Sequence, residues 1–117
     1  MSAVVLGAFG AHALEAHFSA DELETWGTAV LYQFVHSLAL VLTGLWAMVL
    51  PSPGLKLALW SFVLGMLFFS GSLYLLLATG QSWLGAVAPI GGTAFIVGWV
   101  GLFLSARGLT TASIRKA

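Results

Sequence analysis

Charged side chains are scarce in this chain of 117 residues, because Asp, Glu, Lys and Arg together make up only 7% of it. Soluble domains carry about 25% charged residues, so this composition argues against a protein whose surface faces water. The net charge is zero, and four basic residues are too few to grip a phosphate backbone, so nucleic acid is not an expected partner. Cysteine is absent, which excludes disulfides and thiolate metal sites.

Apolar residues are abundant instead, at 60% of the chain, and the mean hydropathy is +1.03. A fold of this length cannot hide so much apolar surface from water, because small domains bury a limited share of their surface. The natural solvent of this protein is therefore lipid. We expect an all-α membrane protein that is embedded in the lipid bilayer.

Three apolar runs are long enough to cross a membrane, since a span needs about 20 residues. They cover residues 29–50, 57–79 and 83–106, and a proline-rich turn at 51–54 separates the first two. A fourth run at residues 2–14 is short, because at helical rise it reaches only about 20 Å. The sequence predicts a four-transmembrane-helix bundle whose first helix is short or truncated.

The short first run has two other interpretations. Ala11-His12-Ala13 has the small-x-small form of a signal-peptide cleavage site, but no Lys or Arg precedes the apolar stretch, as a signal peptide requires. The alternative that we favour is a native start upstream of Met1, which would supply the missing cytoplasmic end of the first helix.

The charges are sorted along the chain. All four carboxylates, Glu15, Asp21, Glu22 and Glu24, lie within one short stretch. With four spans, every basic residue falls on the opposite face, which the positive-inside rule makes cytoplasmic. Three spans would also place the basic residues together but would leave the first segment outside and free, so we favour four spans with both termini inside. The basic residues are Lys56, Arg107, Arg115 and Lys116.

The start of the second helix is marked by a capping box, in which Ser19 and Glu22 each bond to the other's backbone. The neighbouring acids then lie in the first turn, where the helix dipole favours anions. We therefore predict one transmembrane domain over residues 1–117. Its helices cover about 2–14, 20–50, 57–79 and 83–106, and a tail covers 107–117.

Polar and helix-breaking residues of all four helices fall at one depth, in the outer half of the predicted bundle. His36 lies some 8–10 Å inside the hydrocarbon at helical rise, so it must be paired within the protein. The expected partners are Ser70, Ser72, Thr93 or carbonyls freed near Pro89.

Tyr32 and Gln33 share a helical face with His36, because they precede it by four and three positions. His36 could be a functional group, as ionisable residues inside spans are by default. We favour a neutral imidazole that hydrogen-bonds two helices together. If the cluster binds a ligand, the predicted residues are Tyr32, Gln33, His36, Ser70, Ser72, Pro89, Gly91 and Gly92, with His12 as an additional candidate.

Small residues recur at helical spacing and permit close helix packing. Ala3, Gly7 and Ala11 form one such repeat, and the last helix carries several glycines. We predict packing through glycine-rich outer halves, with a kink or an exposed backbone at residues 89–92 as the alternative. The glycines of the last helix are Gly91, Gly92, Gly98 and Gly101.

The sequence gives little support for catalysis, and we predict no catalytic residue, no metal and no cofactor. His12 and Glu15 share a helical face, but His12 and His17 do not, and no paired metal-binding motif is present. No acid lies within the spans to complete a proton relay. Ser70 and Ser72 have no base near them in the sequence.

Five motifs in order carry a resemblance: residues 7–12 (GAFGAH), Tyr32-Gln33 with His36, residues 69–74 (FSGSLY), residues 89–92 (PIGG) and Gly98-Trp99. Over residues 5–104 the chain resembles the YgdD-like small inner-membrane proteins, a domain-of-unknown-function family with relatives in mitochondrial membranes. The resemblance implies a four-helix protein of the bacterial inner membrane with no established activity. Family members carry a longer apolar stretch before the first motif, which agrees with a shortened first helix.

Two functions from different classes remain open. The first is a non-enzymatic structural or accessory bundle, acting alone, as a homo-oligomer or within a larger membrane complex. The second is a binder or oligomeric transporter of a small lipophilic or ionic ligand, such as a quinone, at the outer-half cluster. A redox or hydrolytic enzyme has the least support.

Overall fold

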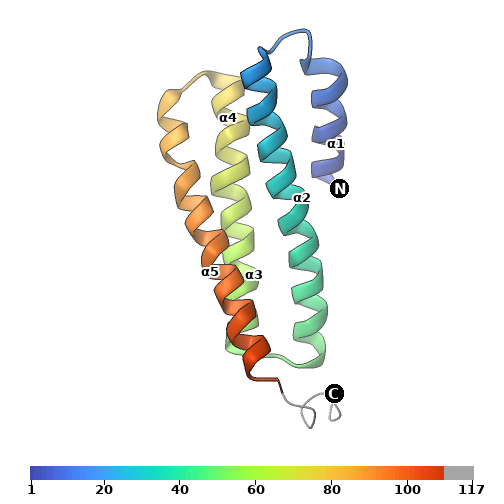
Figure 1. Cartoon of the computed structure of the whole chain (residues 1–117), viewed down its shortest axis with the longest axis vertical. Helices are drawn as coiled ribbons and strands as arrows, with labels where there is room; N and C mark the ends of the chain where they lie inside the picture. Colours follow the sequence, from blue (N-terminus) through green and yellow to red (C-terminus); the bar gives the residue numbers. More distant parts are fainter. Residues whose placement is uncertain (110–117) are drawn as a thin grey trace.

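The computed structural model describes residues 1–109, apart from the side chain of Ala11, as a bundle of helices (Figure 1). Three helical segments are long and apolar enough to cross a membrane, and a shorter apolar helix covers Ser2–Leu14. Arg115 and Lys116 of the predicted tail lie outside the described residues. The elements are α1 (Ser2–Phe9), η1 (Gly10–Leu14), α2 (Ala20–Val49), α3 (Pro53–Gly65), η2 (Met66–Ser70), α4 (Gly71–Thr79), η3 (Ser82–Ala86) and α5 (Ala88–Arg107).

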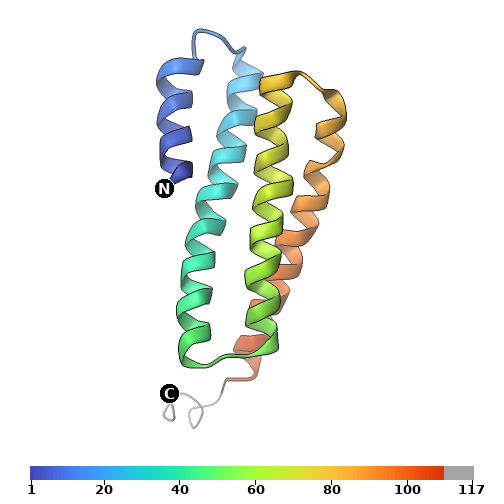
Figure 2. The same cartoon turned by 180° about the vertical axis from the view of Figure 1, so that it is seen from behind.

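The predicted all-helical class and three membrane-length segments are confirmed. Ala20–Val49, Pro53–Thr79 and Ser82–Arg107 run alternately up and down the bundle (Figures 1 and 2). The second of these is continuous through α3, η2 and α4, where η2 is a wider π-helical turn. A fourth crossing and the orientation in the membrane stay predictions.

The helix ends follow local chemistry. The predicted capping box is present, because the Ser19 N–H donates to Glu22 Oε1 at 3.1 Å and the Glu22 N–H donates to Ser19 Oγ at 3.2 Å. The next helix begins at Pro53, earlier than the predicted residue 57, since the Ser52 hydroxyl caps it and proline suits a first turn. Gly80 ends α4 with φ +72°, a conformation that glycine adopts without strain.

The alternative interpretation of residues 89–92, a kink or an exposed backbone, is wrong. α5 is an unbroken α-helix from Ala88, and Pro89 lies in its first turn. N–H groups in the first turn have no acceptor within the helix, so a proline there breaks no hydrogen bond. The irregular segment lies earlier, in η3. Pro89 therefore frees no carbonyl inside the span, and its own carbonyl accepts from the Thr93 hydroxyl at 2.9 Å.

Glycines let α3 and α5 approach closely along their whole length. A Cβ on Gly101 would lie 2.7 Å from the Gly54 carbonyl oxygen, so only glycine fits there. Gly98 packs in the same way against the Phe62 ring, and Gly91 packs against the Phe69 backbone. Close glycine packing thus occurs at Gly91, in the predicted outer half, and also at the opposite end, where Gly101 approaches Gly54.

The short N-terminal helix packs on the first half of α2 and does not reach the second half (Figures 1 and 2). Ala3 is buried, Gly7 faces Val30, and Gly10 lies directly against the Trp26 ring. The small-residue repeat thus makes the predicted close contact at its first two positions, and the third, Ala11, has no described side chain.

The core combines aromatic rings with small side chains, whereas the outer surface of the bundle is strongly apolar. Phe62 and Phe95 are buried together with Ala39 and Ala58. Large apolar side chains cover the outer surface of the long helices, and Met48 is 81% exposed. A monomer in water does not expose apolar surface on this scale, so lipid is the solvent of this face.

Candidate functional site

His36 lies near the middle of α2 and is only 4% exposed. Its Nε2 lies 3.0 Å from the indole nitrogen of Trp99, and its Nδ1 lies 2.8 Å from the Tyr32 carbonyl oxygen. An indole N–H can only donate, so Nε2 must accept. The proton is then on Nδ1, which donates to the carbonyl, and the imidazole is neutral with both nitrogens occupied.

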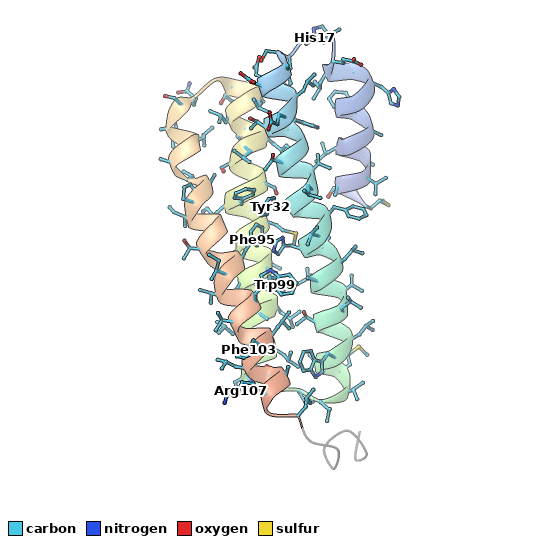
Figure 3. All side chains as sticks on the ribbon, in the orientation of Figure 1. His17, Tyr32, Phe95, Trp99, Phe103 and Arg107 are labelled. Atoms are coloured by element: carbon cyan, nitrogen blue, oxygen red, sulfur yellow. The ribbon has the colours of Figure 1, made fainter. Side chains whose placement is uncertain are left out.

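Aromatic rings from two other segments surround this imidazole. The Phe95 ring is stacked on it at 3.6 Å between centroids and 12° between planes. The Phe62 ring meets it edge-on at 5.5 Å, and the Tyr32 ring lies 6.0 Å away and nearly parallel. Figure 3 shows Tyr32, Phe95 and Trp99 between α2 and α5. We call Tyr32, His36, Phe95 and Trp99 the His36 cluster.

The predicted partners of His36 are wrong. Ser70 donates its hydroxyl to the Ala29 carbonyl at 2.7 Å, and so joins η2 to α2. Ser72 donates within its own segment to the Phe69 carbonyl at 2.9 Å. Thr93 also bonds to its own helix, so none of the three hydroxyls reaches the imidazole. Every buried polar side-chain atom of the described residues has a hydrogen-bond partner.

Gln33 belongs to a second group of contacts. Its Oε1 accepts from the Tyr74 hydroxyl at 2.7 Å, and its Nε2 donates to the Ser2 hydroxyl at 2.6 Å. Nearby, the Trp26 indole donates to the Leu6 carbonyl at 2.9 Å. We call these five residues the Gln33 cluster, which joins α1, α2 and α4. Gln33 and His36 therefore bond to different residues.

A groove of about 440 Å³ lies between α2 and α5, beside the His36 cluster. Of the predicted ligand-binding residues, Tyr32, His36, Pro89 and Gly92 line it. Gly91 is buried against the backbone of η2 instead. The structure thus brings together four of the eight predicted residues around one space. It adds Phe69, Thr93, Phe95, Ile96 and Trp99, which the sequence analysis did not assign to a ligand site.

The additional candidate, His12, is exposed on η1 and does not line this groove. His17 is exposed in the following loop. Among the described residues, no group of three or more His, Asp or Glu side chains is placed to hold a metal ion. The groove is therefore the place where the predicted residues converge.

A further polar contact lies at the other end of the bundle. The hydroxyls of Ser52 and Ser105 are 3.0 Å apart, which joins the start of α3 to the end of α5. Ser52 also accepts from the Leu55 N–H at 3.3 Å. The sequence analysis missed this contact, although Ser52 before a helix-starting proline is a typical capping signal.

Comparison with known proteins gives the same picture of a small membrane protein. The family model described as protein of unknown function (DUF423) matches residues 6–92. The UPF0382 membrane protein SH2409 of Staphylococcus haemolyticus is 45% identical over 105 residues, which are 90% of this chain and 85% of that protein. The UPF0382 membrane protein YwdK of Bacillus subtilis is 43% identical over 105 residues, 89% of this chain and 85% of that protein. No solved structure matches the chain.

Proposed function

This chain belongs to the DUF423 (UPF0382) family of membrane proteins of unknown function, and on that premise we propose that it is a structural or accessory bundle without enzymatic activity. The observation that carries the proposal is the closed hydrogen bonding of His36. Trp99 and the Tyr32 carbonyl occupy both ring nitrogens, so neither is available to a metal or a substrate unless a contact breaks.

The other polar side chains of the long helices support the same role. Ser70 links η2 to α2, and Gln33 links α2 to both α1 and α4. Hydrogen bonds of this kind, together with small residues at the contacts, drive helix association in lipid, where the hydrophobic effect between helices is absent. The polar groups thus fix which faces of the helices meet.

For the membrane arrangement we propose a bundle of four helices in the bacterial inner membrane, in which the three long helices cross the membrane, the short Ser2–Leu14 helix takes the place of the predicted fourth span, and the C-terminal end lies in the cytoplasm. Lys56 and Arg107 lie at one end of the bundle, and the acids Asp21 and Glu22 lie at the other. The short Ser2–Leu14 helix returns antiparallel to α2 from the acidic end (Figure 1). Reporter fusions at Gln81 and after Arg107 should report the periplasm and the cytoplasm, and the reverse result would contradict this orientation.

The finer YgdD-like relationship, with its mitochondrial relatives, also remains a proposal. Its support is the order of the motifs at residues 7–12, 69–74 and 89–92, which the DUF423 match covers.

We further propose that the bundle associates with copies of itself or with a larger membrane complex. Its support is the large apolar surface that the long helices leave outside the bundle.

The structural role is tested by His36→Ala in the purified full chain in detergent. We expect a lower thermal midpoint, because the substitution leaves the Trp99 indole without its acceptor and opens a cavity beside Phe95. Thr28→Ala is the matched control, since its hydroxyl bonds within its own helix, to the Glu24 carbonyl. An unchanged thermal midpoint, with loss of a small molecule that co-purifies with the native protein, would favour ligand binding instead.

The second candidate function is binding, or transport as an oligomer, of a small lipophilic or ionic ligand. One observation favours it: the groove of about 440 Å³ beside the His36 cluster is lined by four of the predicted ligand-binding residues, Tyr32, His36, Pro89 and Gly92. Tyr32 and Trp99 frame the groove and stay 40% and 46% exposed, so a ligand could contact them without unfolding the bundle.

A further inference from the structure

We propose that the groove between α2 and α5 binds a neutral quinone ring that enters from the lipid phase. This inference rests on the second candidate function and names its ligand. It is drawn from three features of the groove: its lack of charge, the flat rings that line it and one hydroxyl donor.

The lining of the groove selects for a neutral ligand. None of its lining residues carries a formal charge when the imidazole of His36 is neutral, as its hydrogen bonds require. An ionic ligand would lose its hydration here without a counter-charge, which is strongly unfavourable at membrane depth. Of the lipophilic and ionic ligands considered, the groove therefore fits the lipophilic class.

The rings in the groove favour a flat ligand. His36 and Phe95 are 4% and 3% exposed and form a closed, stacked pair, so they belong to the protein's own packing. Tyr32 and Trp99 are the partly exposed rings: Tyr32 packs on Phe69 and Trp99 packs on Phe62, at 4.6 and 5.2 Å between centroids, and each leaves the rest of its ring open. Aromatic faces stack on other flat rings in offset or tilted arrangements, which a flexible acyl chain cannot reproduce.

One hydrogen-bond donor remains for the ligand. The Trp99 N–H is committed to His36, and the Thr93 hydroxyl is committed to the Pro89 carbonyl. Tyr32 uses its carbonyl, not its hydroxyl, in its bond to His36, and its side chain is 40% exposed, so its hydroxyl is the donor left for a ligand among the described residues of the groove. A ligand that complements the groove should therefore bring an acceptor, and a quinone combines a flat neutral ring with carbonyl acceptors and an apolar tail.

The groove can be reached from the bilayer. α5 packs mainly along α3 and η2, and it meets α2 almost entirely through side chains. Ile96 lies at the edge of the groove and is 65% exposed, so a ligand tail can continue into the acyl chains. Figure 3 places Tyr32 and Trp99 in the space between the two ribbons.

The test is calorimetric titration of the full chain in detergent with decylubiquinone, referenced to empty micelles. Decylbenzene is the matched ligand, because it has a flat ring and the same tail but no carbonyl. We expect saturable binding of decylubiquinone, at one molecule per chain, and at least tenfold weaker binding of decylbenzene. Removal of one hydrogen bond by Tyr32→Phe should weaken decylubiquinone binding about fivefold while the ring stays in place.

Two glycine variants locate the site. Gly92→Leu fills the groove, and its Cβ would meet only the Phe69 ring at an ordinary 4.0 Å, so the fold should survive. Gly44→Leu is the control, because nothing lies within 4 Å of its Cβ position and it does not line the groove. We expect at least tenfold loss of binding in the first variant and none in the second.

Contrary outcomes distinguish failure of the quinone assignment from failure of the groove as a binding site. Equal binding of decylbenzene and decylubiquinone, abolished by Gly92→Leu, would overturn the quinone assignment and leave a lipophilic site in the groove. No saturable binding of either ligand, or binding that Gly92→Leu leaves intact, would overturn both the quinone assignment and the groove as a binding site.

Discussion

Trp99 on α5 donates its indole N–H to His36 on α2 across 3.0 Å, and the two residues are 63 positions apart in the chain. Packing between α2 and α5 is otherwise sparse, because α5 lies mainly on α3 and η2. This hydrogen bond and the rings around it therefore form the direct link between the two helices, which also pack on the same segment, α3 with η2.

A double-mutant cycle should detect this bond. Trp99→Phe leaves the His36 Nε2 without its donor, and we expect a loss of about 1 kcal/mol in the free energy of unfolding, given that interhelical hydrogen bonds in membranes are worth about 0.6–2 kcal/mol. His36→Phe combined with Trp99→Phe should lose less than the sum of the single variants. Unfolding of the purified chain by titration with a denaturing detergent gives these energies.

The control for this cycle is Trp60→Phe. Trp60 is 62% exposed and makes no side-chain hydrogen bond with the described residues, so its replacement should leave stability within about 0.5 kcal/mol. Strictly additive energies for His36 and Trp99 would contradict a direct bond between them.

A methyl group at Gly101 should separate α3 from α5. Its carbon would lie 2.7 Å from the Gly54 carbonyl oxygen, so the backbones must move apart in Gly101→Ala. We expect a loss of about 1–3 kcal/mol, as for other overpacked contacts. Gly44→Ala has open space at the same carbon and should be neutral or slightly stabilising, because alanine favours helix. Equal thermal midpoints for the two variants would refute the close approach.

The Gln33 cluster should hold the N-terminal helix in place. Gln33→Leu removes the acceptor of the Tyr74 hydroxyl and the donor to Ser2 in one step. Hydrogen–deuterium exchange of the amides in residues 2–14 should then become faster, while exchange in α5 stays unchanged. Gln81→Leu, in the exposed turn before η3, is the control. Faster exchange throughout the chain would indicate a general loss of stability instead.

The two serines at the opposite end should differ in their contributions. Ser105→Ala removes only the contact between the two hydroxyls, which is worth about 0.5–1.5 kcal/mol. Ser52→Ala removes the same contact and the cap of α3, whose loss adds about 0.5–2 kcal/mol. Thermal midpoints should therefore fall further in Ser52→Ala, and the reverse order would show that the cap contributes little.

The helices could be predicted because their signals are local. The capping box at Ser19 and the apolar runs depend on neighbouring residues only, and the structure confirms them. The glycines of the last helix likewise indicate close packing. Which helix they meet, and over what length, depends on α3, so the Gly54–Gly101 contact could not be located from one helix alone.

The site was harder to predict because depth along a helix does not give direction around it. Gln33 and His36 are three positions apart, which leaves their side chains about 60° apart on a helix of 3.6 residues per turn. That difference is enough for one to face Tyr74 and the other Trp99. One signal was available: an indole N–H within a span needs an acceptor unless it lies at the interface, which marks Trp99 as a partner for a buried acceptor.

The two ways in which α5 is attached have a mechanical consequence. Its main chain touches that of α3 at Gly54, so these two helices can shift only as a unit. Its link to α2 consists of rings and one hydrogen bond, which side-chain rotation can release. Lateral pressure in the bilayer, or a guest molecule, should therefore disturb the contact of α2 with α5 before that of α3 with α5, while the Ser70 hydroxyl still holds α2 to η2.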